Sequence, residues 1–143
     1  MTTYKLDILS PEGSVFSGEV TQACFPTLSG QITILAGHTA LISKLSSGEV
    51  EIEQNGEKKS IAIMGGFLEV SDNIVSVIAD FAIRSDDIDE QKIQQAKQYA
   101  QEQLKKKDKV SSEFAEREFQ KAILELKVFE HKKLKNKPKG AKY

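Results

Sequence analysis

The periodicity of apolar residues changes between Arg84 and Asp89, and no other feature of the sequence constrains the fold as strongly. Residues 1–84 form short alternating apolar segments separated by glycine-containing turns, whereas residues 89–137 contain neither glycine nor proline. Alternation with a period of two is typical of strands, and apolar spacings of three and four are typical of helices. Strands followed by helices, with no crossovers between them, predict an α+β chain built from two modules.

The first module is predicted to be an antiparallel β-sandwich or flattened barrel of eight to ten strands, because turn signals recur at short intervals along residues 1–84. The segment Glu49–Gln54 alternates most regularly. Its acidic side chains are expected on one solvated face: Glu49, Glu51 and Glu53. The dipeptide Asn55-Gly56 that follows predicts a hairpin with a type I′ turn, since both residues tolerate positive φ.

Three further expectations concern individual strands of the first module. The nearly all-apolar segment Ile74–Asp80 predicts a strand buried on both faces. Gly65 and Gly66 indicate a bulge or a close approach of two backbones. The single cysteine, Cys24, lies in an apolar segment and is expected to be a buried, inert thiol.

The second module is predicted to be an antiparallel helical hairpin. Asp89 is placed to cap the first helix, and Ile88 and Ile93 fall at the hydrophobic-staple positions. Residues 105–112 form a polar connection whose two serines could cap the second helix. The apolar faces are narrow: Ile93, Ala96, Ala100 and Leu104, then Ala115, Phe119, Ala122, Leu126 and Phe129. Such faces stabilise a hairpin weakly, so the hairpin is expected to be marginal. The expected domains are therefore the sandwich (residues 1–84), a hinge (85–88) and the hairpin with its basic tail (89–143).

Charge and hydropathy limit the classes of partner. Residues 1–84 carry five basic and ten acidic residues, whereas residues 85–143 carry 15 basic and 11 acidic ones. The last 13 residues contain six lysines and no acid, which is typical either of a solvated end or of a basic arm for an anionic surface. No signal-peptide pattern and no run of 18 apolar residues is present, so a soluble chain that meets a membrane only through a partner is expected.

Few residues in the sequence suit catalysis or metal binding. His38 and His131 lie in different modules, which supports neither a metal site nor a catalytic triad, and no metal ligands are assigned. The acidic first module disfavours nucleic-acid binding. Two alternatives stay open on the residues alone: a small hydrolase that uses His38 as a base, and a small scaffold or adaptor with a basic arm for anionic surfaces.

Four segments, in this order and at this spacing, resemble the epsilon subunit of the bacterial F-type rotary ATP synthase, which is called delta in mitochondria. They are residues 9–20 (LSPEGSVFSGEV), 30–41 (GQITILAGHTAL), 65–70 (GGFLEV) and 77–80 (VIAD). The resemblance is close over residues 4–90 and holds in outline beyond them. Ala36 departs from the family pattern, which usually has a proline before the Gly-His pair.

The resemblance implies a non-catalytic central-stalk subunit, peripheral to the cytoplasmic side of the bacterial membrane. In this family the sandwich binds the gamma subunit and the ring of c subunits and helps to couple proton flow to ATP synthesis. The hairpin can extend toward the catalytic alpha/beta hexamer and inhibit ATP hydrolysis. Matching by residue gives Gln31, His38 and Thr39 as candidates for the gamma and ring contacts. It gives a second group as candidates for acidic surfaces on the catalytic subunits: Lys127, Lys132, Lys133 and Lys135.

Some family members bind ATP through an Ile-Asp-x-x-Arg-Ala motif and through arginines on the second helix. Ile88 and Asp89 match this motif, but Lys92 stands where the family has arginine. On the second helix, Lys121 and Glu125 occupy arginine positions. A lysine does not reproduce the guanidinium fork, and a glutamate repels phosphate. The resemblance therefore implies no cofactor and weak or absent ATP binding.

Overall fold

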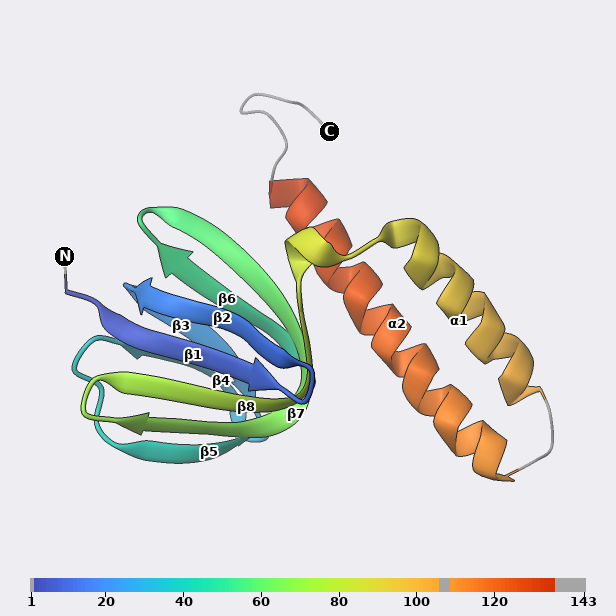
Figure 1. Ribbon diagram of the computed structural model, residues 1–143, viewed down its shortest axis with the longest axis horizontal. Coiled ribbons are helices and arrows are strands. Elements are labelled where there is room, and N and C mark those ends of the chain that lie inside the picture. Colours follow the sequence, from blue (N-terminus) through green and yellow to red (C-terminus); the bar gives the residue numbers. More distant parts are fainter. Residues whose placement is uncertain (1, 106–108, 136–143) are drawn as a thin grey trace. The chain divides into compact units, whose positions relative to one another are not determined.

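The computed structural model describes residues 2–105 and 109–135 of the 143-residue chain (Figure 1). The chain divides into two compact units, Met1–Arg84 and Ser85–Tyr143. The first unit contains only strands and the second only helices, so the change in sequence periodicity coincides with a change in structure.

The first unit has eight strands. They are β1 (Tyr4–Ser10), β2 (Gly13–Val20), β3 (Gln22–Thr27), β4 (Gly30–Leu35), β5 (Leu41–Leu45), β6 (Gly48–Gln54), β7 (Glu57–Ser71) and β8 (Ile74–Arg84). They follow the order β2-β1-β8-β7-β5-β3-β4, and β6 pairs with β3 and β7. Only the β1–β8 pair is parallel; the others are antiparallel, as the short turns require. The predicted sandwich is confirmed.

Strand β7 joins the two layers of the sandwich. Residues 57–63 pair with β6, residues 66–70 pair with β5, and β8 follows β7 along nearly its whole length. The partner changes at Gly65 and Gly66, which have φ of 69° and 121°. A Cβ atom on Gly66 would lie 2.1 Å from the carbonyl oxygen of Ile78. The predicted close approach of two backbones is therefore confirmed, and only glycine fits at this point.

The core lies between the two layers and is built from the inward positions of every strand. Its largest fully buried side chains are Tyr4, Phe25, Leu6, Ile8, Ile34, Leu45, Ile52, Ile61, Ile63, Leu68, Val20 and Val50. The hydroxyl of Tyr4 donates to the carbonyl oxygen of Ile34 at 2.9 Å, which satisfies the one polar group of this side chain. Burial raises the pKa of Tyr4 well above its usual value, so the phenol stays neutral.

Three expectations about the strands are wrong. Ile74–Asp80 is not buried on both faces: Ile78 is 64% exposed, while Val75, Val77 and Ala79 face the core. β8 lies between β1 and β7 and has only one face toward the core, so its apolar composition does not report its burial. Cys24 is half-buried and is oriented outward, since its neighbours Ala23 and Phe25 occupy the inward positions of β3.

The third concerns the acidic face of β6. Glu49, Glu51 and Glu53 are half-buried rather than fully solvated. Strand β6 is flanked on one side by β3 and on the other by β7, so its side chains have neighbours on both sides. Its alternation and the Asn55-Gly56 turn are as predicted: Val50 and Ile52 face the core, and φ is 53° and 78° in the turn.

The second unit is a hairpin of two helices, α1 (Glu90–Leu104) and α2 (Lys109–Lys135), preceded by a short 3₁₀ helix, η1 (Ser85–Asp87). The predicted capping residue is confirmed. A carboxylate oxygen of Asp89 accepts from the backbone N–H groups of Gln91 and Lys92 at 3.1 and 3.3 Å. These bonds satisfy two donors of the first turn that have no partner within the helix.

Two details of the hairpin differ from expectation. Helix α2 begins at Lys109, so Ser112 lies inside the helix and the predicted polar connection is shorter than residues 105–112. Ala96, expected on the apolar face of α1, is exposed, whereas Ala100 is buried. The buried side chains of the two helices are Ala100, Ala115, Ala122, Glu125 and Val128. Most of these residues are small, which allows close packing but buries little apolar area.

Candidate functional site

The first candidate surface is the loop between β4 and β5, which carries His38 and Thr39. The N–H of His38 donates to the carbonyl oxygen of Leu35 at 3.3 Å, and Gly37 has φ of 79°. A bond between the first and fourth residues with positive φ only at the third defines a type II turn. Thr39 is exposed and His38 is partly exposed, so both are accessible on this unit.

The ring of His38 is fixed against its own loop. Its Nδ1 atom lies 2.8 Å from the carbonyl oxygen of Thr39. A carbonyl oxygen only accepts, so Nδ1 carries the proton in this contact and Nε2 is the acceptor of the neutral ring. In this tautomer, Nε2 of the neutral ring can accept a hydrogen bond from a partner.

Gln31, the third candidate for the gamma and ring contacts, lies on β4 and is exposed. Its Oε1 atom is 3.8 Å from Sγ of Cys24, which lies on β3 two residues from Pro26, the residue that pairs with Gln31. Gln31 and the pair His38 and Thr39 lie near the two ends of the same short strand and in the loop that follows it. The structure thus places all three on one β4 to β5 segment.

An exposed apolar row crosses the outer face of the sandwich. Phe67 of β7 pairs with Ile78 of β8, which pairs in turn with Leu9 of β1. Their exposed fractions are 57%, 64% and 46%. Ile42 of β5, 75% exposed, lies two positions along β5 from Lys44, the partner of Phe67. We call Leu9, Ile42, Phe67 and Ile78 the apolar row. The sequence did not predict this row, because Ile78 was expected to be buried with the rest of its apolar strand. The unusual apolar content of that strand was the signal that could have revealed it.

The lysines near the end of α2 differ in their surroundings. Lys132 forms an ion pair with Asp86 of η1, and Lys133 lies 5.9 Å from the centre of the Phe129 ring. Lys127 is exposed. The backbone of Lys135 ends α2, and its side chain lies outside the described residues, as does the basic tail from 136 onward. Among the predicted acidic-surface lysines that are described on this unit, Lys127 and Lys133 are exposed and Lys132 is partly buried.

The residues of the partial nucleotide motif serve the folding of the hairpin. Ile88 is buried, and the carboxylate of Asp89 caps α1 through the N–H of Lys92. On α2, Glu125 is only 3% exposed. Burial raises the pKa of Glu125, Lys121 lowers it and Glu118 raises it further. A buried acid thus stands at a position where the resemblance implies an arginine in ATP-binding members of the family.

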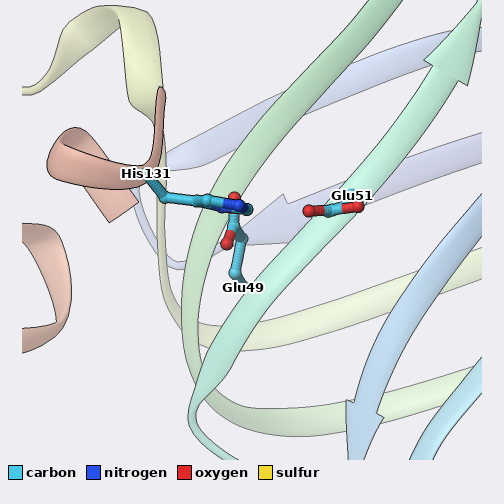
Figure 2. A group of neighbouring side chains, drawn as sticks. All are labelled: Glu49, Glu51 and His131. Carbon is cyan, nitrogen blue, oxygen red and sulfur yellow. The ribbon is translucent and has the colours of Figure 1, made fainter. Parts of the chain in front are cut away.

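The two histidines lie on separate units, and the acidic residues of β6 share a unit with only one of them. Figure 2 shows Glu49 and Glu51 on β6 and His131 on α2. Glu49 and Glu51 belong to the sandwich unit, as does His38, whereas His131 belongs to the hairpin unit. The catalytic alternative based on His38 would need partners within the sandwich.

Comparison with known proteins identifies the family. Residues 3–85 match the model for the β-sandwich domain of the ATP synthase delta/epsilon chain. The ATP synthase epsilon chain of Endomicrobium trichonymphae is 43% identical over 128 residues, which cover 89% of this chain and 93% of the relative. That of Janthinobacterium sp. (strain Marseille) is 41% identical over 127 residues, 87% of this chain and 91% of the relative.

Solved structures agree on the fold. A chain in the cryo-EM structure of the Euglena gracilis mitochondrial ATP synthase, which contains OSCP, F1 and the c-ring, has a TM-score of 0.65 at 22% identity. The match covers 94% of this chain and 82% of that one. A chain of the Tetrahymena thermophila central stalk and c-ring has a TM-score of 0.59 at 16% identity, covering 87% of this chain and 95% of that one.

A β-sandwich followed by a helical hairpin, with these relatives, places the protein among the non-catalytic subunits of ATP synthases. Within that class, the chain belongs to the delta/epsilon family. The hydrolase and adaptor alternatives are therefore set aside. The ATP synthase is a membrane-associated complex. Neither helix in the described residues is both long and apolar enough to cross a bilayer.

Proposed function

We propose that this protein is the central-stalk subunit that joins the gamma subunit to the ring of c subunits and helps to couple proton flow to ATP synthesis. The observation that carries the proposal is the 43% identity to an ATP synthase epsilon chain across nearly the whole length of both proteins. The fold supports it, since related folds occur in structures that contain a central stalk and a c-ring. Within the complex, this subunit lies on the cytoplasmic side of the bacterial membrane and reaches the membrane only through its partners.

We assign the contact with the ring of c subunits to the β4–β5 segment, which comprises β4 and the loop that follows it. Gln31 and Thr39 are exposed, and His38 presents a ring nitrogen able to accept a hydrogen bond. We assign the contact with gamma to residues next to this segment and to the apolar row. Exposed contiguous apolar side chains commonly mark a protein–protein interface, and a subunit of a large assembly has such a partner.

A charge placed within the apolar row tests the assignment to gamma. Ile78→Lys should reduce co-purification of the full-length chain with gamma, because a lysine at the centre of an apolar interface must be desolvated. Glu57→Lys is a suitable control: it adds a lysine at an exposed position of the neighbouring strand β7, ten residues along that strand from Phe67, the pairing partner of Ile78. Equal binding of wild type and Ile78→Lys would refute the assignment.

The hairpin is proposed to inhibit ATP hydrolysis by extending toward the alpha/beta hexamer, with Lys127, Lys132, Lys133 and Lys135 meeting acidic surfaces. The small residues buried between α1 and α2 support this, because a weakly stabilised hairpin can exchange its contacts. Removing residues 89–143 should raise ATP hydrolysis by the assembled complex and leave assembly intact. Unchanged hydrolysis would exclude the inhibitory role.

Binding of ATP to the isolated chain is proposed to be weak or absent. Lys92 and Lys121 replace arginines of the family motif, and Glu125 adds a buried carboxyl group beside Lys121. Asp89 already uses its carboxylate as the cap of α1. Titration calorimetry with Mg-ATP should detect no sub-millimolar binding; a tight, saturable signal would contradict the proposal.

A further inference from the structure

Asn73 occupies a turn that few residues could form. The turn joins β7 to β8 through only two residues, Asp72 and Asn73, with Ser71 paired to Ile74. Both turn residues have positive φ, 51° and 60°. This combination is the type I′ turn, which favours asparagine, aspartate and glycine. The backbone of the turn explains why a small polar residue stands at position 73, but it leaves the asparagine side chain unaccounted for.

The side chain of Asn73 bridges two segments that are distant in sequence. Its Oδ1 atom accepts from the backbone N–H of Gly37 at 2.8 Å. Its Nδ2 atom donates to the carbonyl oxygen of Thr3 at 2.9 Å, just before β1. The backbone oxygen of Asn73 also accepts from the N–H of Lys5 at 3.3 Å. One amide therefore uses its acceptor on the β4–β5 loop and its donor on the start of β1, and only one orientation of the amide satisfies both.

The loop that Asn73 contacts has no proline in its turn. In the type II turn of residues 35–38, the second position is the one at which proline is favoured, because its ring fixes φ. Here that position is Ala36, which leaves φ free. The bond from Gly37 to Asn73 acts on the next residue of the same turn, the one with positive φ. The external hydrogen bond thus holds the Ala36–Gly37 peptide, which follows directly on the torsion that a proline at position 36 would fix.

We propose that Asn73 is a positioning residue, whose side chain holds the β4–β5 loop in the conformation that presents His38 and Thr39 to the rotor. The inference rests on the proposed function, in which this loop contacts the ring of c subunits. Asn73 itself need not touch the ring. Its role is to reduce the number of conformations that the loop must give up on binding, which strengthens an interface without adding a contact.

Hydrogen exchange of the full-length chain tests the positioning directly. Asn73→Gly keeps a residue that tolerates positive φ and removes the amide, and Asn73→Asp keeps an acceptor for Gly37 but loses the donor to Thr3. We expect the Gly37 amide to exchange about fivefold faster in Asn73→Gly, as for the loss of one exposed hydrogen bond, and to change less in Asn73→Asp. Asn55→Gly, in the type I′ turn between β6 and β7, is the matched control and should leave Gly37 unaffected.

A second substitution distinguishes positioning from a general loss of stability. Ala36→Pro supplies a restraint within the loop, so in the Asn73→Gly background it should return exchange of the His38 amide, which is bonded to Leu35 within the turn, to within about twofold of the wild-type rate. The Gly37 amide should stay fast in the double variant because its acceptor is absent. Proline cannot replace the bonds of Asn73 to β1, so a defect caused by loosening of β1 would persist. Failure of Ala36→Pro to rescue, or unchanged exchange of Gly37 in Asn73→Gly, overturns the proposal.

The assembled complex tests whether the loop position matters for function. Asn73→Gly should lower ATP synthesis driven by an ion gradient, and the double variant with Ala36→Pro should restore it. Faster loop exchange with unchanged synthesis would refute the positioning role in coupling. The docking function is tested separately by replacing His38 and Thr39 with alanine: if that variant couples normally, the proposed loop contact itself is wrong, whatever Asn73 does.

Discussion

The sandwich and the hairpin use apolar residues in different ways. In the sandwich, Tyr4, Phe25 and Ile63 are buried almost completely by strands from distant parts of the sequence. In the hairpin, the buried positions of α1 and α2 are mainly alanines such as Ala100, Ala115 and Ala122. Burying an alanine removes much less apolar area from water than burying an isoleucine or phenylalanine. We therefore expect the first unit to be held firmly in one structure and the second to be held more weakly.

The largest expected effect lies where the two layers of the sandwich meet. Gly66→Ala should destabilise the protein by about 4 kcal/mol or prevent folding, because the new Cβ would overlap the Ile78 carbonyl and φ would be strained. Urea unfolding measures the loss. Gly13→Ala is the control: it has a similar φ of 131° but nothing within 4 Å of the new Cβ. Equal effects of the two substitutions would show that strain alone, without the close approach, sets the cost.

Matched isoleucine deletions compare the two units directly. Ile63→Ala in β7 removes a side chain with no exposed surface and should cost about 3 kcal/mol. Ile93→Ala in α1 removes a half-buried one and should cost about 1 kcal/mol. Thermal unfolding followed separately by strand and helix signals in circular dichroism would measure both. Similar losses would mean that the hairpin is held as firmly as the sandwich.

The capping residue of α1 should matter only locally. Asp89→Ala removes the acceptor for the first-turn N–H groups and should destabilise α1 by about 1 kcal/mol, seen as faster amide exchange at Gln91 and Lys92. Asp87→Ala, two residues earlier in η1, is the control because it removes the same charge outside the cap. Exchange in the sandwich should stay unchanged, and a change there would contradict a purely local role for the cap.

The smallest effect is expected from the buried acid of α2. Because the folded pKa of Glu125 is raised, the folded state binds its proton more readily than the unfolded state. Its contribution therefore favours folding below the unfolded pKa and is lost as the pH rises through the folded pKa. Glu125→Gln should flatten this dependence and stabilise the hairpin near neutral pH by roughly 1 kcal/mol or less. Glu118→Gln is a comparison on the same helix. A wild-type hairpin that becomes more stable on raising the pH through this range would contradict the assignment.

The sequence predicted those parts of the structure that depend on local chemistry. The Asn55-Gly56 turn and the Asp89 cap were accessible because each rests on the properties of one or two residues. The exposure of Ile78 was not, since an apolar strand looks the same whether one or both faces are covered by other layers. The start of α2 was misplaced because its polar first turn resembles a connection.

The candidate site divides along the same line. Gln31, His38 and Thr39 could be proposed from a resemblance between short segments, and the structure places them on one strand and its following loop. Asn73 could not, because 36 residues separate it from Gly37 and only the folded sandwich brings the two together. Its sequence signal, a turn of Asp and Asn, indicates the backbone of the turn but not the partner of the side chain.

The last residue of the sandwich also has a mechanical consequence. Arg84 donates through Nε to the carbonyl oxygen of Val15 at 2.6 Å, and its guanidinium lies 5.8 Å from the centre of the Phe16 ring. A tension applied through the connection to η1 would therefore reach β2 as well as β8. The force would be shared between β2 and β8, which lie on either side of β1, so the end of β8 should separate less readily from the sheet. The contacts of Arg84 should thus help this end of the sandwich to keep its structure when a force acts on the hairpin.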